Sequence, residues 1–391
     1  MRAQAWRRAA AVVTLVATTM SALGARPQDA ATQAKRAYER AVELEGRGDY
    51  SASLALLWEA SGLAPNDPDI QNRLGEALDR IGALDAAIDA FRRAVATRRD
   101  FKKAENNLIL TLVKAGKGPE SLTRARALVA AAPNDPERLF TLGLAQADQD
   151  LEGAIATLRQ VLTLAPRHVL ARYNLALVLK RADRLREAID ELQRAIAIEP
   201  RAEAHYTLAT IYRQQGDLDR AVTALRDAIA INGGYVDAYA ALGSVLQAQR
   251  DASGAVAALK RAIALAPDQP APRHALAQVL RQMGDSAGAR KELEEAERQR
   301  VRAARAHEAL VWTAVGIEKV TNGDPASALT YFKRAIATDA DYAPAHYQAG
   351  LVLRERGELD AARAAFATAQ RLNPRLISPY ETPHKDRPSP L

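Results

Sequence analysis

Cysteine is absent from this sequence of 391 residues, and aromatic residues make up only 5% of it. The absence of cysteine excludes disulfide frameworks, thiolate zinc sites, iron–sulfur clusters, a cysteine nucleophile and a lipid-anchoring cysteine. Because the strands of sandwiches and barrels are rich in aromatic and β-branched residues, the shortage of aromatics favours closely packed helices instead. With 48% hydrophobic and 26% charged residues, the composition is that of a folded globular protein.

Long apolar runs are also missing, apart from a short one near the N-terminus. Three arginines precede a mostly apolar stretch over residues 9–23, and Ala22-Leu23-Gly24 offers small residues for cleavage. This arrangement is typical of a secretory signal peptide. The alternative is an uncleaved N-terminal membrane anchor, although the stretch is shorter than the roughly 20 residues that span a bilayer. We therefore expect a signal peptide at 1–24, a disordered linker at 25–33, no membrane span in the mature chain, and a periplasmic or secreted location.

A pattern of small residues recurs with a period near 34 from residue 34 onward. In most repeats a turn signal separates two small residues, as at Gly216-Asp217. Glycine can adopt the positive φ that ends a helix, and aspartate can cap the helix that follows. Each repeat is therefore predicted to be a pair of antiparallel helices. The predicted starts of the repeats are residues 34, 68, 102, 136, 169, 202, 236, 270, 309 and 343.

This pattern resembles the tetratricopeptide repeat (TPR) family over residues 34 to about 376, with ten repeats in register. Small side chains stand where two helix backbones approach closely, and Leu or Phe fills the space between them. No single pair of helices can bury its apolar face, so neighbouring repeats must stack. The resemblance implies an all-α fold, a right-handed superhelical solenoid with the first helix of each repeat on its concave side.

Two departures from the pattern divide the chain. The repeats at 270 and 309 start 39 residues apart with no Gly or Pro between Gly288 and Gly316, so the second helix of repeat 8 is expected to continue toward repeat 9. Residues 377–391 are rich in proline, which cannot continue a helix, and are expected to form a tail. The predicted organisation is repeats 1–8 at 34–303, a helical joint at 304–308, and repeats 9 and 10 at 309–376.

Catalytic signatures are missing as well. The sequence contains neither a Gly-x-Ser-x-Gly elbow nor a Gly-x-x-x-x-Gly-Lys phosphate-binding loop. Its six histidines are far apart, and none forms the His-x-x-x-His pair that holds a metal on a helix. The sequence therefore predicts a non-enzymatic protein with no cofactor and no metal.

Candidate binding residues follow from the resemblance, which implies that positions 5, 6, 9, 12 and 13 of each first helix face the concave groove. Position 5 is aromatic or His in several repeats, position 6 is Asn in two, and position 12 is basic in several. The predicted groove residues are Tyr38, Asn107, Phe140, Tyr173, Asn174, Lys180, Tyr206, Arg213, His274 and Arg281. The alternative is that the tyrosines fill gaps between repeats and the arginines are ordinary surface residues. Near the N-terminus, Asp69, Glu76 and Asp79 predict an acidic stretch of groove.

These observations predict an exported, non-enzymatic scaffold or adaptor that binds a partner protein or an extended peptide in its groove, with a role in assembling cell-envelope complexes. The basic residues at position 12 predict a partner that carries acidic residues. The first alternative is a nucleic-acid-binding helical repeat protein, which the basic residues permit and the signal peptide disfavours. The second alternative is an enzyme with an unrecognised site.

Overall fold

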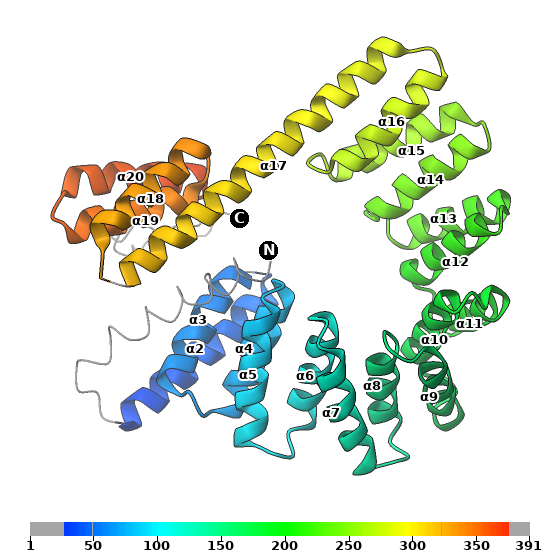
Figure 1. Cartoon of the computed structure of the whole chain (residues 1–391), viewed down its shortest axis with the longest axis horizontal. Coiled ribbons are helices and arrows are strands. Elements are labelled where there is room, and N and C mark those ends of the chain that lie inside the picture. Colours follow the sequence, from blue (N-terminus) through cyan, green and yellow to red (C-terminus); the bar gives the residue numbers. More distant parts are fainter. Residues whose placement is uncertain (1–26, 49, 322, 375–391) are drawn as a thin grey trace. The chain divides into compact units, whose positions relative to one another are not determined.

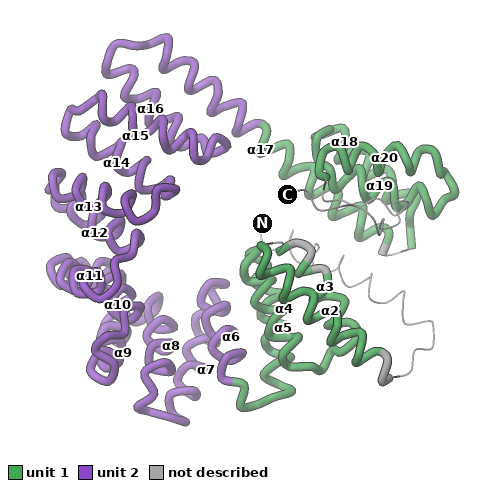
Figure 2. The backbone as a smooth tube through the Cα atoms, turned by 180° about the vertical axis from the view of Figure 1, so that it is seen from behind, with its two compact units in different colours: residues 1–101, 302–391 green, residues 102–301 purple. Residues whose placement is uncertain are grey.

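The computed structural model describes residues 27–48, 50–321 and 323–374. These residues form 19 helices and no strands, which confirms the predicted all-α class. The chain divides into two compact units, unit 1 with residues 1–101 and 302–391 and unit 2 with residues 102–301 (Figure 2). The predicted signal peptide (1–24) and tail (377–391) lie outside the described residues and remain predictions.

Unit 2 is a row of helix pairs that follow one another in chain order (Figure 1). The first helix of each of its repeats begins at the predicted start, at 102, 136, 169, 202, 236 and 270. The pairs are α6 (Lys102–Lys114) with α7 (Gly118–Ala130), α8 (Pro136–Gln146) with α9 (Leu151–Leu164), α10 (Val169–Arg181) with α11 (Leu185–Ile198), α12 (Ala202–Gln214) with α13 (Leu218–Ile231), and α14 (Val236–Ala248) with α15 (Ala252–Leu265). Repeat 8 begins with α16 (Pro270–Gln282).

Unit 1 contains the same kind of helix pair. Its helices before residue 101 are α2 (Pro27–Gly46), α3 (Tyr50–Leu63), α4 (Pro68–Arg80) and α5 (Leu84–Thr97), and those after residue 321 are α18 (Pro325–Thr338), α19 (Ala343–Glu355) and α20 (Leu359–Leu372). Residues 27–33, expected as a linker, belong to α2. The difference has a local cause, because proline suits the first position of a helix and the alanines that follow have high helix propensity.

The predicted continuation of repeat 8 is present as α17 (Ser286–Thr321), a single helix of 36 residues. The boundary between the two units, at residues 301 and 302, falls inside this helix. Residues 300–305 are all exposed, so this part of α17 contributes no side chain to a core. The segment includes Arg302 and Arg305, which form no ion pair with any residue that the structure describes.

The turns inside the repeats follow the predicted chemistry. Gly216 has a φ of +78°, and the carboxylate of Asp217 accepts a hydrogen bond from the backbone N–H of Arg220 at 3.0 Å. Two repeats place other residues in the same left-handed conformation, Asp183 with a φ of 56° and Arg250 with a φ of 67°. These two residues carry the backbone strain that glycine avoids elsewhere.

The core inside each repeat depends on a pair of positions with complementary volumes. A Cβ added to Gly75 would lie 2.5 Å from the nearest ring carbon of the buried Phe91, so the ring occupies the space that a larger residue would need. Gly316 faces Phe332 and Gly350 faces Phe366 in the same way. Gly143 and Gly243 face Leu158 and Leu259, and the repeats with Ala at the first position have Leu at the second. The Ala–Leu pairs include Ala176 with Leu192 and Ala209 with Leu225, and repeat 3 reverses the sizes with Ile109 and Ala125.

Candidate partner-binding site

The candidate site lies within unit 2, on the surface formed by the first helices of successive repeats. α10 contacts α12, and α14 contacts α16, so these first helices lie next to one another along the solenoid. Two cavities open on this surface. The α8–α12 cavity has a volume of about 470 Å³ and is lined by Leu144, Ala147, Asn174, Leu177, Val178, Lys180, Arg181 and Gln214. The α12–α16 cavity has a volume of about 270 Å³ and is lined by Tyr206, Ala209, Thr210, Arg213, Leu225, Asp237, Ala240, Ala241, Ser244, Val245, Ala271, Pro272 and Ala275.

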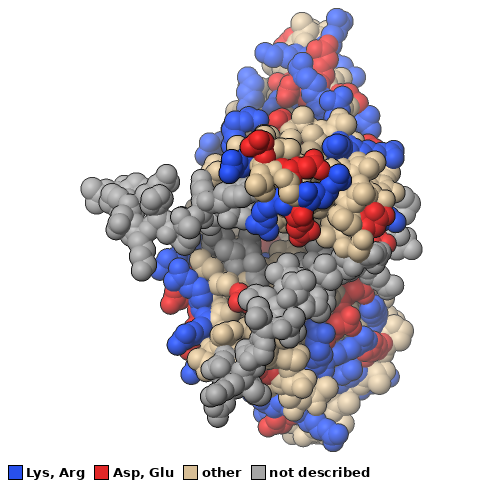
Figure 3. All heavy atoms as spheres, turned by 90° about the vertical axis from the view of Figure 1, so that its left-hand side faces the viewer, with Lys and Arg blue, Asp and Glu red and all other residues tan. Residues whose placement is uncertain are grey.

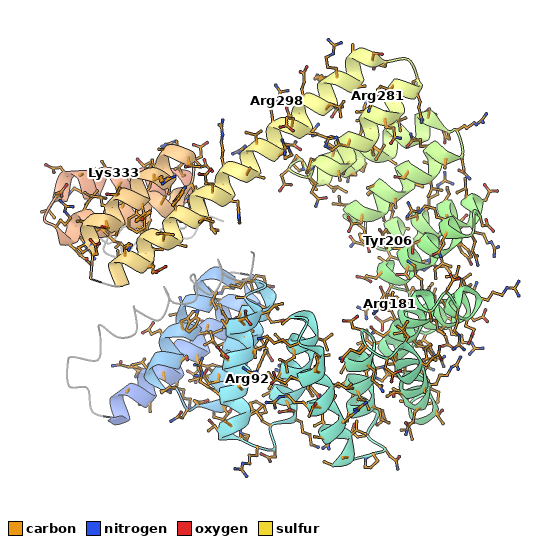
Figure 4. All side chains as sticks on the ribbon, viewed as in Figure 1. Arg92, Arg181, Tyr206, Arg281, Arg298 and Lys333 are labelled. Carbon is orange, nitrogen blue, oxygen red and sulfur yellow. The ribbon has the colours of Figure 1, made fainter. Side chains whose placement is uncertain are left out.

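We call the surface that contains these two cavities the first-helix groove. Figure 4 labels Arg181 on α10 and Tyr206 on α12, which contribute to different cavities of this groove. Helical periodicity explains the arrangement, because residues three, four and seven apart share one face of a helix. On α14 that face carries Asp237, Ala240, Ala241 and Ser244, so small side chains leave room beside Tyr206.

The aromatic residues at position 5 connect each repeat to the next. The rings of Phe140 and His168 lie 4.9 Å apart, and those of Tyr206 and Tyr235 lie 5.3 Å apart. The hydroxyl of Tyr173 is 3.3 Å from the Thr207 hydroxyl on the following first helix. All of these rings are half-buried. These contacts support the interpretation that the aromatic residues fill gaps between repeats. Because the rings are only half-buried, part of each remains on the surface.

Two basic residues of the groove lack a carboxylate partner. The ammonium group of Lys180 donates a hydrogen bond to the Thr210 hydroxyl at 2.7 Å. Burial, and secondarily repulsion from Arg213, hold the pKa of Lys180 below its ordinary value. Arg213 is exposed, and neither cation forms an ion pair with a residue in the described part of the chain. The groove therefore presents two neighbouring positive charges that form no ion pair with an acidic side chain of residues 27–48, 50–321 or 323–374.

The tyrosines beside these cations are harder to ionise than a tyrosine in water. Burial raises the pKa of Tyr235 to about 12, and the nearby Tyr206, Tyr173 and Asp237 contribute in the same direction. Burial also raises the pKa of Tyr206, while Arg213 opposes the rise. Their hydroxyl groups therefore remain neutral donors and acceptors at neutral pH.

Of the other predicted groove residues, Asn174 alone lines one of the two cavities. His274 and Arg281 are exposed on α16, but neither is among the residues that line the α12–α16 cavity. The side-chain amide of Asn174 donates to the Leu170 carbonyl at 2.8 Å, and Asn107 is half-buried on α6. Tyr38 belongs to unit 1, where it packs against a small core that includes Ala34, Ala60 and Ile70.

The predicted acidic stretch is largely neutralised within unit 1. The carboxylate of Asp69 lies 2.6 Å from the Arg98 guanidinium, and that of Glu76 lies 3.3 Å from Arg73. Arg73 also pairs with Glu45 at 2.6 Å. Internal pairs of this kind hold successive helices together and leave less charge for a ligand.

Sequence reasoning missed Tyr235, Thr210, Asp237 and Ser244. A signal for Tyr235 exists, because several repeats carry an aromatic residue or His immediately before their first helix. These residues are Phe101, His168, Tyr235 and Tyr342. His168 and Tyr235 each contact an aromatic ring of the preceding repeat, so this pattern marks contacts between successive repeats. Thr210 and Ser244 carry no such signal, since small polar residues are common on helix surfaces.

Other kinds of site were also sought. No group of His, Asp and Glu side chains within residues 27–48, 50–321 and 323–374 is arranged to hold a metal ion. Over the same ranges, no helix has both the length and the apolar character that a membrane span requires.

The stacked helix pairs and their groove define a helical-repeat protein of the interaction type. Models described as tetratricopeptide repeat match residues 38–101 and 313–376, 145–211 and 246–311, and a model described as TPR repeat matches 209–249. The chain belongs to the tetratricopeptide repeat family, which confirms the resemblance inferred from the small residues and turns.

Several solved structures are similar to this chain. A tetratricopeptide repeat protein from Parabacteroides merdae is 18% identical, with a TM-score of 0.50 over 64% of this chain and 99% of that chain, and it shares the fold. A thermophilic TPR protein from Thermus thermophilus is 25% identical, with a TM-score of 0.43 over 46% of this chain and 100% of that one. MamA from Desulfovibrio magneticus is 26% identical, with a TM-score of 0.38 over 43% of this chain and 95% of its own.

Proposed function

We propose that this protein is an exported, non-enzymatic scaffold that binds an extended, acidic segment of a partner protein in the first-helix groove of unit 2. The observation that carries the proposal is the pair of unneutralised cations, Lys180 and Arg213, beside two cavities with mainly apolar walls. Apolar walls provide burial for a ligand, and the cations favour negative charge. The chain has the protein-interaction fold of its family, and the proposal assigns that role to this surface.

The alternative of nucleic-acid binding receives less support. A phosphate backbone needs an extended basic surface, whereas Asp237 shares a cavity with Arg213. Figure 3, which views the molecule from the left-hand side of Figure 1 and not onto the first-helix groove, shows Lys and Arg interspersed with Asp and Glu on that face rather than gathered in one basic patch. A cavity lined by charges of both signs suits a protein partner better than a polyanion such as a nucleic acid.

The proposed binding site is tested by comparing matched variants in a quantitative pull-down from the cell-envelope fraction. Arg213→Gln removes one groove cation, and Tyr206→Ala removes part of the groove wall. Arg194→Gln is the control, because Arg194 is an exposed residue of the second helix α11 that lines neither cavity and whose charge is paired with Glu191 at 3.1 Å. We expect the groove variants to lose a partner that wild type and the control retain, and binding to weaken with added salt. Equal recovery by all four proteins would place the binding surface elsewhere.

The proposed export is tested independently of binding. Cell fractionation followed by mass spectrometry of the N-terminus should find a soluble mature chain that begins near Ala25. Recovery of the intact N-terminus in the membrane fraction would instead support the anchor.

A further inference from the structure

The two cavities of the first-helix groove are separated by a polar bridge. Lys180 lines the α8–α12 cavity, and its ammonium group bonds to the hydroxyl of Thr210, which lines the α12–α16 cavity. Arg213, one helical turn beyond Thr210, lines the second cavity as well. One positive charge therefore belongs to the lining of each cavity, and the Lys180–Thr210 hydrogen bond connects the two linings.

The walls of both cavities are mainly apolar on either side of this bridge. Leu144, Leu177 and Val178 contribute to the α8–α12 cavity. Ala240, Ala241, Val245, Pro272 and Ala275 contribute to the α12–α16 cavity. Each cavity has the size and lining that suit one or two apolar side chains, since such sites combine apolar walls with a few placed polar groups.

The far wall of the α12–α16 cavity carries a negative charge. Asp237 lines it from the first turn of α14, and no basic residue that the structure describes forms an ion pair with its carboxylate. Glu203 lies near Tyr235, whose pKa it helps to raise. A ligand carboxylate placed deep in this cavity would meet like charge, whereas one placed at the bridge would meet Lys180 and Arg213. The position favoured for an acid is therefore between the cavities.

We infer that the first-helix groove recognises a sequence pattern in its partner, two apolar side chains that flank one acidic residue in an extended segment. One apolar anchor enters the α8–α12 cavity, the acid bonds to Lys180 and Arg213, and the second anchor enters the α12–α16 cavity. The inference rests on the proposed function and makes it specific, because it states which residues of a partner the groove binds and in what order they follow one another.

The spacing of the anchors follows from the packing of the helices. The first cavity is centred on α10 and the second on α14, two helices apart along the groove. Packed helices lie about 8–10 Å apart and neighbouring first helices come no closer than that, so the anchors must span at least roughly 16–20 Å. An extended chain advances about 3.3 Å per residue, which corresponds to about five or six residues between anchors. The acid should then lie near the middle of this interval.

The experiment uses the full chain and synthetic peptides of Gly and Ser that carry two leucines and one central Asp. Acetylated and amidated ends remove the terminal charges, so capture of a free carboxyl terminus cannot contribute. Leucine separations of two to eight residues are compared by fluorescence anisotropy. We expect the tightest binding at five or six residues, and a loss of about tenfold when Asp is replaced by Asn, as for a charge-assisted hydrogen bond.

Protein variants then assign each part of the peptide to its place. Lys180→Met with Arg213→Gln should make the Asp and Asn peptides bind equally, whereas Arg194→Gln, which changes a cation outside both cavities, should leave the preference intact. Ala241→Leu should fill part of the α12–α16 cavity and remove the benefit of one leucine. Ala248→Leu is its control, because Ala248 is an exposed residue at the end of the same helix. Circular dichroism establishes that each variant is folded.

An unbiased selection separates failure of the inference from failure of the proposed function. Random displayed peptides are selected on the full chain and then tested against Arg213→Gln and Tyr206→Ala. Selected peptides that depend on both residues and share the flanked acid support the inference. Peptides that depend on both residues but lack this pattern overturn the inference and leave the groove as the binding surface. If no selected peptide depends on either residue, both proposals are wrong.

Discussion

The paired positions inside each repeat give a prediction that can be worked out from the structure. Gly75 of α4 faces Phe91 of α5, and an added Cβ would lie 2.5, 2.7 and 2.8 Å from three atoms of the ring. Phe91 is only 1% exposed, so it has little freedom to move aside. Overpacking of this kind costs about 1–3 kcal/mol, while Ala gains about 1 kcal/mol over Gly in a helix interior. We expect Gly75→Ala to lower the free energy of unfolding by up to about 2 kcal/mol, the overpacking cost less the gain in helix propensity.

The same substitution should be harmless once the ring is smaller. Repeats 5 and 6 hold Ala and Leu at these two positions with both side chains buried, so the Ala–Leu combination is compatible with the fold. Phe91→Leu alone should cost about 1 kcal/mol through the lost ring volume. In that background Gly75→Ala should be neutral or stabilising, which gives a coupling energy of about 2 kcal/mol between the two positions.

The assay must report on this repeat, because a solenoid need not unfold in one step. Hydrogen exchange of the amides in α4 and α5, together with urea unfolding followed by circular dichroism, measures the local and total effects. Gly46→Ala is the matched control, since a Cβ there would meet nothing within 4 Å. If Gly75→Ala costs the same with Phe91 and with Leu at position 91, the complementary volumes do not determine the packing.

Three further predictions concern other parts of the chain. Replacing Arg250 by Gly relieves a φ of 67° and should raise the free energy of unfolding by about 0.5–1 kcal/mol, whereas Gly216→Ala at the equivalent turn should lower it by about 1 kcal/mol. A decrease for Arg250→Gly or an increase for Gly216→Ala in urea titrations would contradict the strain argument. Because residues 300–305 are exposed, trypsin should cleave among the arginines of 298–305 before it cleaves α12. Equal resistance of the two segments would show that the joint is as stable as the rest of the solenoid. Because the pKa of Tyr235 is raised to about 12, folding favours its protonated form. Its contribution to stability is therefore complete below about pH 10, the pKa of an unfolded tyrosine, and is lost as the pH rises toward 12. Tyr235→Phe should remove this loss in alkaline urea titrations, and an unchanged pH profile would show that another group is responsible.

The sequence alone determined the class of fold and where its repeats begin. Eight predicted starts, from 68 to 270 and at 343, coincide with the first residue of a helix. The reason is that the signals are local, since a turn glycine, a capping aspartate and a small residue at a close approach each act within one pair of helices. The continuous helix α17 was predictable for the same reason, because no Gly or Pro lies between Gly288 and Gly316.

Only the tertiary structure decided which groove residues meet. The contacts of Lys180 with Thr210 and of Tyr206 with Tyr235 join residues about thirty positions apart on successive repeats. Helical periodicity assigns a residue to a face, but the side chain that reaches a cavity depends on how the next helix packs across it. The α12–α16 cavity thus takes Ala271, Pro272 and Ala275 from α16, although His274 and Arg281 occupy the positions that periodicity favoured. The repeat pattern predicts where each helix begins and which face a residue occupies, whereas the contacts between repeats depend on the particular side chains that pack there.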